Sequence, residues 1–413
     1  MGVKFNYMHN FLQKIRDFSV FELRPEPISI SFNDSSLRFL TLKKKTSSIL
    51  PEAYWREALP KNTVVGGEIK EAKTFTECLK NGLRKINAGN KKGVYAVVVL
   101  PENATFLKPL SLPKMSGEEI DASLATLVEQ NIPLSKEEAE ADWQFSDFNK
   151  NDQQTDILVA ASSKTSVERI LEIMNEASII PVALDPAPLS IARALINKTE
   201  KKPQLIVHFN HDKTIFVLHD DNSIDLSMSS LSGVDFMQKK IVAELRADPS
   251  IRTSSEQFDP ELTVEGPQPS SSGQGPSTRS GQGPAAMLDS INTKGFFNDN
   301  IKEKRALENS LADIIDQINK FKSFEHSPSE KDDIKKHCVC QEIILSGYLA
   351  PLPGIDDFIS QKINLPVIVG NPWQQNGKFN VIPKMDLAQS LQFCATIGGA
   401  IYARHWLSSP VLK

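Results

Sequence analysis

Two hairpin-like segments, one in each half of the chain, constrain the fold more than any other feature. Residues 28–42 read ISISFNDSSLRFLTL, and residues 204–219 read QLIVHFNHDKTIFVLH. In both, two strand-like runs flank a short polar turn, because Asn, Asp and Ser tolerate turn geometry while Ile, Phe and Leu favour a pleated sheet. A later strand-like run, EIILSG (342–347), ends in a glycine turn. This repetition predicts two α/β lobes with a ligand cleft between them, the usual place for ligand sites.

Residues 93–183, between the hairpins, read as strand, strand, helix, strand, helix. YAVVVL (95–100) and DILVAA (156–161) are typical of buried strands, and Ser116 followed by Glu119 predicts a capping box at the start of a helix. The pattern indicates one compact α+β module.

Residues 248–295 have a different composition from the rest of the chain. They include GPQPSSSGQGPSTRSGQGPAAM, which is rich in Gly, Pro, Ser and Gln and poor in branched and aromatic residues. Such a segment buries too little apolar surface to offset its ordering entropy, so we expect a disordered loop. It is either an inert insertion or a tether for another component.

The charge and the cysteines exclude some classes of protein. A net charge of −4 gives no field that would attract nucleic acid, so we expect no nucleic-acid partner. Four scattered cysteines form no disulfide framework, which favours a reducing, cytoplasmic setting. HCVC (337–340) places three candidate metal ligands together but lacks the second pair of a structural zinc site. We therefore expect core thiols there and no metal.

The first 27 residues contain an amphipathic stretch and no signal-peptide core. No apolar run reaches the roughly 18 to 20 residues needed to span a bilayer. One helical face would carry Phe11, Leu12, Ile15 and Phe18, and it could rest on an anionic membrane or pack on its own domain.

Five segments in this order resemble the PilM family of type IV pilus assembly proteins, which are actin-like and related to the division protein FtsA. They are the first hairpin, LPKNTVVGGEIKEAKTF, LPKMSGEEIDASLATLVEQNIPLSKEEAEADWQF, DILVAASSKTSVERILEIMNEASIIPVALDPAPLSIARAL and EIILSGYLAPLPGIDDFISQKINLPVIVGNPW. The resemblance implies an α/β, actin-like (ribonuclease-H-like) two-lobed fold with an inserted FtsA-like module. The implied domains are an N-terminal amphipathic segment (1–27), a first lobe (28–92, continued at 184–203), an inserted SHS2-like α+β module (93–183), a second lobe with the disordered loop (204–384), and a C-terminal helix returning to the first lobe (385–413).

The resemblance also places a degenerate nucleotide site at the turns. In active relatives each hairpin turn carries an Asp that holds a cation through water and a Gly that lets backbone amides approach phosphates. Those acids fall here on Ser31 and His208 and the glycines on Asn33 and Asn210, while the adenosine turn keeps Gly347 but has Tyr348 where a small residue is usual. The candidate site residues are Ser31, Asn33, Asp34, Ser35, Ser36, Asn210, Asp212, Lys213, Thr214, Ser346 and Gly347.

The missing acids predict a pseudo-ATPase, because metal-assisted hydrolysis loses its template. Asp34 and Asp212 are candidate displaced acids, although a carboxylate moved along a tight turn points elsewhere. We expect no catalytic residue, no resident metal, and either no cofactor or weakly bound ATP and Mg²⁺.

The resemblance implies a cytoplasmic adaptor peripheral to the bacterial inner membrane, in a pilus, competence or secretion assembly platform. Its expected partner is the N-terminal cytoplasmic tail of a PilN-like membrane protein, held between the first lobe and the inserted module. The alternatives are an active actin-like ATPase and an FtsA-like filament-forming division protein.

Overall fold

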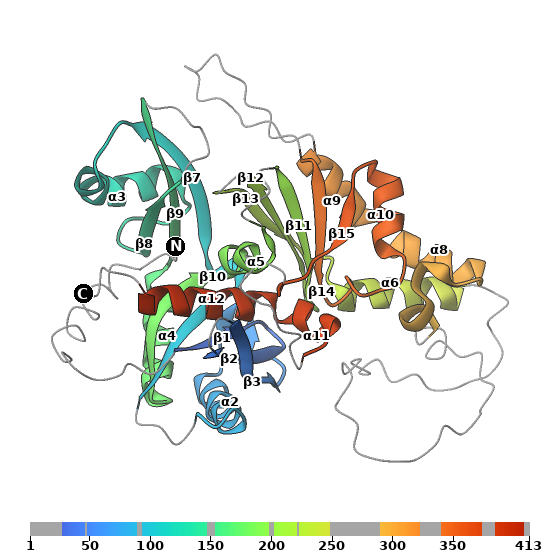
Figure 1. The fold of residues 1–413 in the computed structure, drawn as a ribbon, viewed down its shortest axis with the longest axis horizontal. Helices are drawn as coiled ribbons and strands as arrows, with labels where there is room; N and C mark the ends of the chain where they lie inside the picture. The colour runs from blue at the N-terminus through green and yellow to red at the C-terminus, as the bar shows by residue number, and fades with distance from the viewer. Residues whose placement is uncertain are drawn as a thin grey trace.

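The protein is described by a computed structural model that covers residues 27–45, 48–88, 93–146, 153–197, 202–220, 223–247, 290–322, 340–373 and 385–408. The chain forms two five-stranded sheets and a smaller three-stranded sheet. In Figure 1 the first sheet lies low in the view, the second lies above it and to the right, and the three-stranded sheet lies at the upper left. The amphipathic stretch with Phe11, Leu12, Ile15 and Phe18 lies outside the described residues, as do residues 248–289. None of the described helices is long and apolar enough to cross a membrane.

The first sheet contains the first predicted hairpin. Its order is β10-β6-β1-β2-β3, with β1 antiparallel to β2 and parallel to β6. Helices α2 and α4 cover one face and α12 covers the other, so alternate residues of β2 join different cores: Phe39 packs toward α2, and Leu40 belongs to the core that contains α12. The elements are β1 (Ile28–Phe32), β2 (Ser36–Lys45), β3 (Ser48–Ala58), α2 (Ala72–Lys85), β6 (Val94–Leu100), α4 (Lys164–Glu176), β10 (Ile179–Pro186) and α12 (Cys394–Ser408).

The second sheet repeats the arrangement of the first. Its order is β13-β12-β11-β14-β15, with β11 antiparallel to β12 and parallel to β14, as β1 is to β2 and β6. Helix α5 (Ala187–Leu195) and α12 pack on each other between the sheets and share one apolar core with the second sheet. The elements are β11 (Gln204–Phe209), β12 (Thr214–Asp220), β13 (Ser223–Ser230), α6 (Val234–Ala247), α8 (Ile301–Ser310), α9 (Ala312–Lys322), β14 (Glu342–Gly347), α10 (Ile355–Ile363), β15 (Val367–Val369) and α11 (Leu387–Gln392).

The third sheet is smaller than the predicted 93–183 module. Strands β7 (Phe106–Pro113), β9 (Gln154–Ser163) and β8 (Ala139–Phe145) pair in that order under helix α3 (Gly117–Asn131), around a separate small core. The predicted capping box between Ser116 and Glu119 is confirmed at the start of α3. Strands β6 and β10 instead pair with each other and with β1 in the first sheet. Because β6 is buried on both faces, it fits the middle of the larger sheet, and the range 93–183 is divided between two sheets.

Three local features differ from the sequence analysis or refine it. Strand β3 was not predicted, because its polar and aromatic residues show no clear alternation. The short hairpin of β4 (Val64–Val65) and β5 (Glu68–Ile69) precedes α2. The predicted disorder is wrong for residues 290–295: residues 290–294 are helical, and η3 (Gly295–Phe297) follows. Ile291 and Phe296 are buried, so this end of the segment buries apolar surface. The average composition of residues 248–295 did not indicate this. A further 3₁₀ turn, η1 (Glu102–Ala104), links β6 to β7.

Candidate functional site

The first turn is closed by its own side chains. The Asn33 amide donates to the Ser36 carbonyl (3.1 Å), and Asn33 Oδ1 accepts from the amides of Ser35 (3.1 Å) and Ser36 (2.9 Å). This is the local hydrogen bonding that Asn offers in turns. Ser31, at the position of the expected acid, bonds through Oγ to Thr396 Oγ1 of α12 (2.7 Å). Its side chain is therefore buried in a contact within the protein.

Asp34 is held by the neighbouring β4–β5 hairpin. Its Oδ2 accepts from the Gly66 amide (2.7 Å) and its Oδ1 from the Gly67 amide (2.9 Å). Both glycines have positive φ values, 59° and 81°, which glycine adopts without a steric penalty. Asp34 thus links the first turn to this hairpin with both of its oxygens.

The second turn is anchored by the segment that precedes α6. The Asn210 amide donates to the Lys213 carbonyl (2.8 Å), and Thr214 Oγ1 donates to the Ser232 carbonyl (2.7 Å). Lys213 is buried, and its Nζ lies 3.7 Å from Asp212 Oδ2. Burial raises the pKa of Asp212, Lys213 lowers it, and the negative charge of Asp34 raises it further.

His208, at the other expected acid position, is a neutral buried imidazole. Burial, together with the nearby Arg38 guanidinium, lowers the pKa of His208 to about 3. Its Nδ1 lies 3.1 Å from Ser346 Oγ, and that hydroxyl also donates to Cys394 Sγ (3.0 Å). Burial raises the pKa of the Cys394 thiol to about 12, so neither group carries charge at neutral pH.

The late glycine turn presents Tyr348 toward the first lobe. Gly347 has φ 82°, and a Cβ there would lie 2.1 Å from the Phe209 carbonyl oxygen, so no other residue fits without a backbone shift. The Tyr348 amide donates to that same oxygen (2.9 Å). Its hydroxyl accepts from Arg38 Nη2 (2.9 Å), and its ring lies 4.0 Å from the His211 ring, centroid to centroid.

The predicted site residues lie at the ends of β1, β11 and β14 and in the turns that follow these strands. The sequence analysis missed Arg38, which reaches Tyr348, and Thr396, which bonds to Ser31. Within the described ranges, no group of three or more His, Cys, Asp or Glu side chains could hold a metal ion. Of the HCVC residues only Cys340 is described; it is buried, and its Sγ lies 3.3 Å from the Glu342 carbonyl oxygen.

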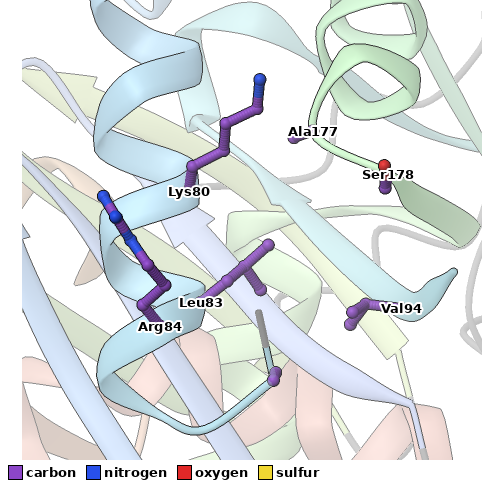
Figure 2. Close-up of a pocket in the computed structure, with 7 residues that line it drawn as sticks. Lys80, Leu83, Arg84, Val94, Ala177 and Ser178 are labelled. Carbon is purple, nitrogen blue, oxygen red and sulfur yellow. The ribbon is translucent and has the colours of Figure 1, made fainter. Parts of the chain in front are cut away.

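A pocket of about 340 Å³ lies away from the turns, where α2 and α4 end beside the start of β6 (Figure 2). Leu83, Val94 and Ala177 form its apolar part, and Lys80 and Arg84 project from α2 at one side. The carbonyl ends of two helices meet here, and they attract positive rather than negative groups. The helix ends carry partial negative charge, whereas Lys80 and Arg84 are positive. The pocket therefore has no consistent preference for a ligand of one charge.

Comparison with known proteins identifies the relatives of the chain. Residues 29–224 match the family described as type IV pilus assembly protein PilM. A solved structure, the PilM-PilN type IV pilus biogenesis complex, is similar with a TM-score of 0.66 at 16% identity, covering 92% of this chain and 99% of that one. MreB 5 of Spiroplasma citri bound to AMPPNP is similar with a TM-score of 0.50 at 12% identity, covering 93% and 98%. The likeness to these structures shows an actin-like fold, and residues 29–224, just under half of the chain, are similar to the PilM family of type IV pilus assembly proteins.

Proposed function

We propose that this chain is a cytoplasmic adaptor in the inner-membrane assembly platform of a type IV pilus or a related competence or secretion system. It binds the cytoplasmic tail of a PilN-like membrane protein and does not hydrolyse ATP. The family match and the likeness to a chain of a PilM-PilN complex support the partner.

The chemistry of the two turns carries the proposal that ATP is not hydrolysed. The expected acid positions hold Ser31 and His208, whose polar atoms bond to Thr396 and Ser346 inside the protein. A divalent cation beside a triphosphate needs carboxylate or water ligands held in place by the protein. Neither side chain supplies a negative charge, so the template for metal-assisted hydrolysis is missing.

The two remaining acids do not replace that template. Asp34 uses both oxygens on the Gly66 and Gly67 amides. Asp212 is mostly buried, and burial raises its pKa, which opposes the charged form that a cation requires. Magnesium nucleotide therefore does not fit these turns as it would in an active relative.

The tail of the partner is expected to bind as an extended segment. Such segments add backbone hydrogen bonds and place alternate side chains in shallow pockets. We propose that the tail lies between the first lobe and the inserted module, which here is the third sheet with α3. The N-terminal stretch with Phe11, Leu12, Ile15 and Phe18 is proposed as a second, peripheral contact with the membrane.

Titration calorimetry on the full chain tests both parts of the proposal. One titrant is a synthetic N-terminal peptide of the PilN-like protein encoded nearby, with a scrambled peptide of the same composition as control. The other is ATP with Mg²⁺, accompanied by a phosphate-release assay. We expect binding of the native peptide alone and no phosphate release. Release of phosphate that is lost in Asp34→Asn or Asp212→Asn would favour the active ATPase. Filaments with ATP and no peptide binding would favour the FtsA-like alternative.

A further inference from the structure

Tyr348 crosses from one lobe to the other at the place where the two turns meet. It follows β14 in the second sheet, and its hydroxyl accepts from Arg38 on β2 in the first sheet (2.9 Å). On the second-lobe side its ring lies against His211, and its amide is tied to the Phe209 carbonyl. The backbone and ring of Tyr348 are thus held by the second lobe, and its hydroxyl contacts the first lobe.

The first lobe presents an uncompensated positive charge to this tyrosine. Arg38 is only 4% exposed, and in the described part of the chain it forms no ion pair and its Nε has no hydrogen-bond partner. A guanidinium cannot lose its proton in a protein, so burial does not neutralise it. The strand register places Arg38 directly opposite Arg56, and like charges in that position destabilise a sheet.

The Tyr348 ring and hydroxyl offset part of this positive charge. The guanidinium carbons of Arg38 and Arg56 each lie 5.9 Å from the ring centroid, within range of a cation–π attraction. The hydroxyl supplies one acceptor to Arg38, and hydrogen bonds to charged groups are stronger than neutral ones. Loss of these contacts would remove the Tyr348 acceptor and ring from the buried Arg38 guanidinium, which lies opposite Arg56.

We propose that Tyr348 is an inter-lobe latch that holds the two lobes closed without nucleotide. The side chain of Tyr348 itself bridges the two lobes through its bond to Arg38. This inference rests on the proposed function in one respect, namely that no nucleotide occupies the space between the turns. Tyr348 acts by positioning the lobes and has no catalytic role.

Hydrogen exchange of the full-length protein, read by mass spectrometry, tests the latch with Tyr348→Phe. This variant keeps the ring and removes only the hydroxyl, so it should fold. We expect exchange in peptides covering residues 31–38 and 345–350 to become about tenfold faster or more, the effect of losing one hydrogen bond to a charged group. Tyr54→Phe is the matched control, because Tyr54 packs edge-on against Phe393 (5.9 Å) and its hydroxyl has no hydrogen bond within the described residues. The control should exchange like wild type.

Equal exchange rates in Tyr348→Phe, Tyr54→Phe and wild type would overturn the latch. Exchange of the wild-type protein with ATP and Mg²⁺ separates this outcome from failure of the proposed function. Slower exchange at the turns on addition of nucleotide would contradict the proposed function, whereas the comparison of the two Phe variants in nucleotide-free buffer would still decide the latch.

Discussion

The closest approach between the two central helices gives a sharp prediction for Gly398→Ala. A Cβ at Gly398 of α12 would lie 1.8 Å from the Ser190 carbonyl oxygen of α5 and 2.5 Å from its carbonyl carbon. Ordinary van der Waals contact begins near 3.4 Å, so the helices would have to separate locally by about 1.6 Å, the difference between the two distances. Both neighbours are backbone atoms, which cannot rotate away as a side chain can.

The magnitude follows from two opposing contributions. Replacing Gly by Ala in a helix stabilises the folded state by about 0.5–1 kcal/mol. Overpacking a tight core contact costs about 1–3 kcal/mol and sometimes more, and a backbone clash belongs at the upper end. We therefore expect Gly398→Ala to lower the free energy of unfolding by about 2 kcal/mol. Because a chain of 413 residues has a large unfolding entropy, the melting temperature should fall by roughly 2–3 °C.

Gly117→Ala is the matched control for this prediction. Gly117 begins α3, and its added Cβ would lie 3.6 Å from the nearest Trp143 ring atom, an ordinary contact. Differential scanning fluorimetry at one protein concentration should show this control melting at or slightly above the wild-type temperature. If Gly398→Ala melts at or above wild type, the α5–α12 contact is looser than the structure shows and the reasoning is refuted.

Three further predictions concern single side chains. Asp34→Ala should lower the free energy of unfolding by about 2–3 kcal/mol, because two glycine amides lose a charged acceptor, and Asp34→Asn should lower it less. Urea unfolding measures both variants, and stability equal to wild type in both would contradict this prediction. His208 should show no imidazole titration by NMR between pH 8 and 5, because its pKa is lowered to about 3, and a titration midpoint near 6.5 would refute the buried neutral state. Below about pH 6.5 only the unfolded chain takes up this proton. The free energy of unfolding should therefore fall by about 1.4 kcal/mol per pH unit from there toward pH 3. Ser116→Ala should cost about 1 kcal/mol through loss of the capping box, whereas Ser123→Ala, in the middle of the same helix, should be close to neutral in thermal unfolding.

Local patterns predicted the elements whose signals are local. The first hairpin and the α3 capping box depend on residues within a few positions of each other, so the sequence alone predicts them. Strand β3 pairs with the adjacent β2, but its residues show no clear alternation. The sheet membership of β6 and β10 depends on pairing partners far along the chain, which periodicity does not reveal.

The site shows the same limit. Ser31 bonds to Thr396, 365 residues away, and Arg38 bonds to Tyr348, 310 residues away. Arg38 alternates with Leu37 and Phe39 on β2 and would be read as a solvent-facing residue, but the face it shares with Leu40 is covered by α12 and the second lobe. The sequence signal for Arg38 was its position as a charged residue in a strand that is buried on both faces.

The position of α12 also affects how the chain folds during synthesis. Strands β1, β2 and β6 emerge early, but one face of their sheet is covered by a helix that begins at Cys394. Domains generally fold as they are made, from the N-terminus onward, at about 5–20 residues per second. An apolar face that includes Leu40, Leu42 and Val99 therefore waits for most of the chain, for a time of tens of seconds. The ribosome-bound intermediate should be a strong client for chaperones, and its first lobe should become protease-resistant only after α12 has left the exit tunnel.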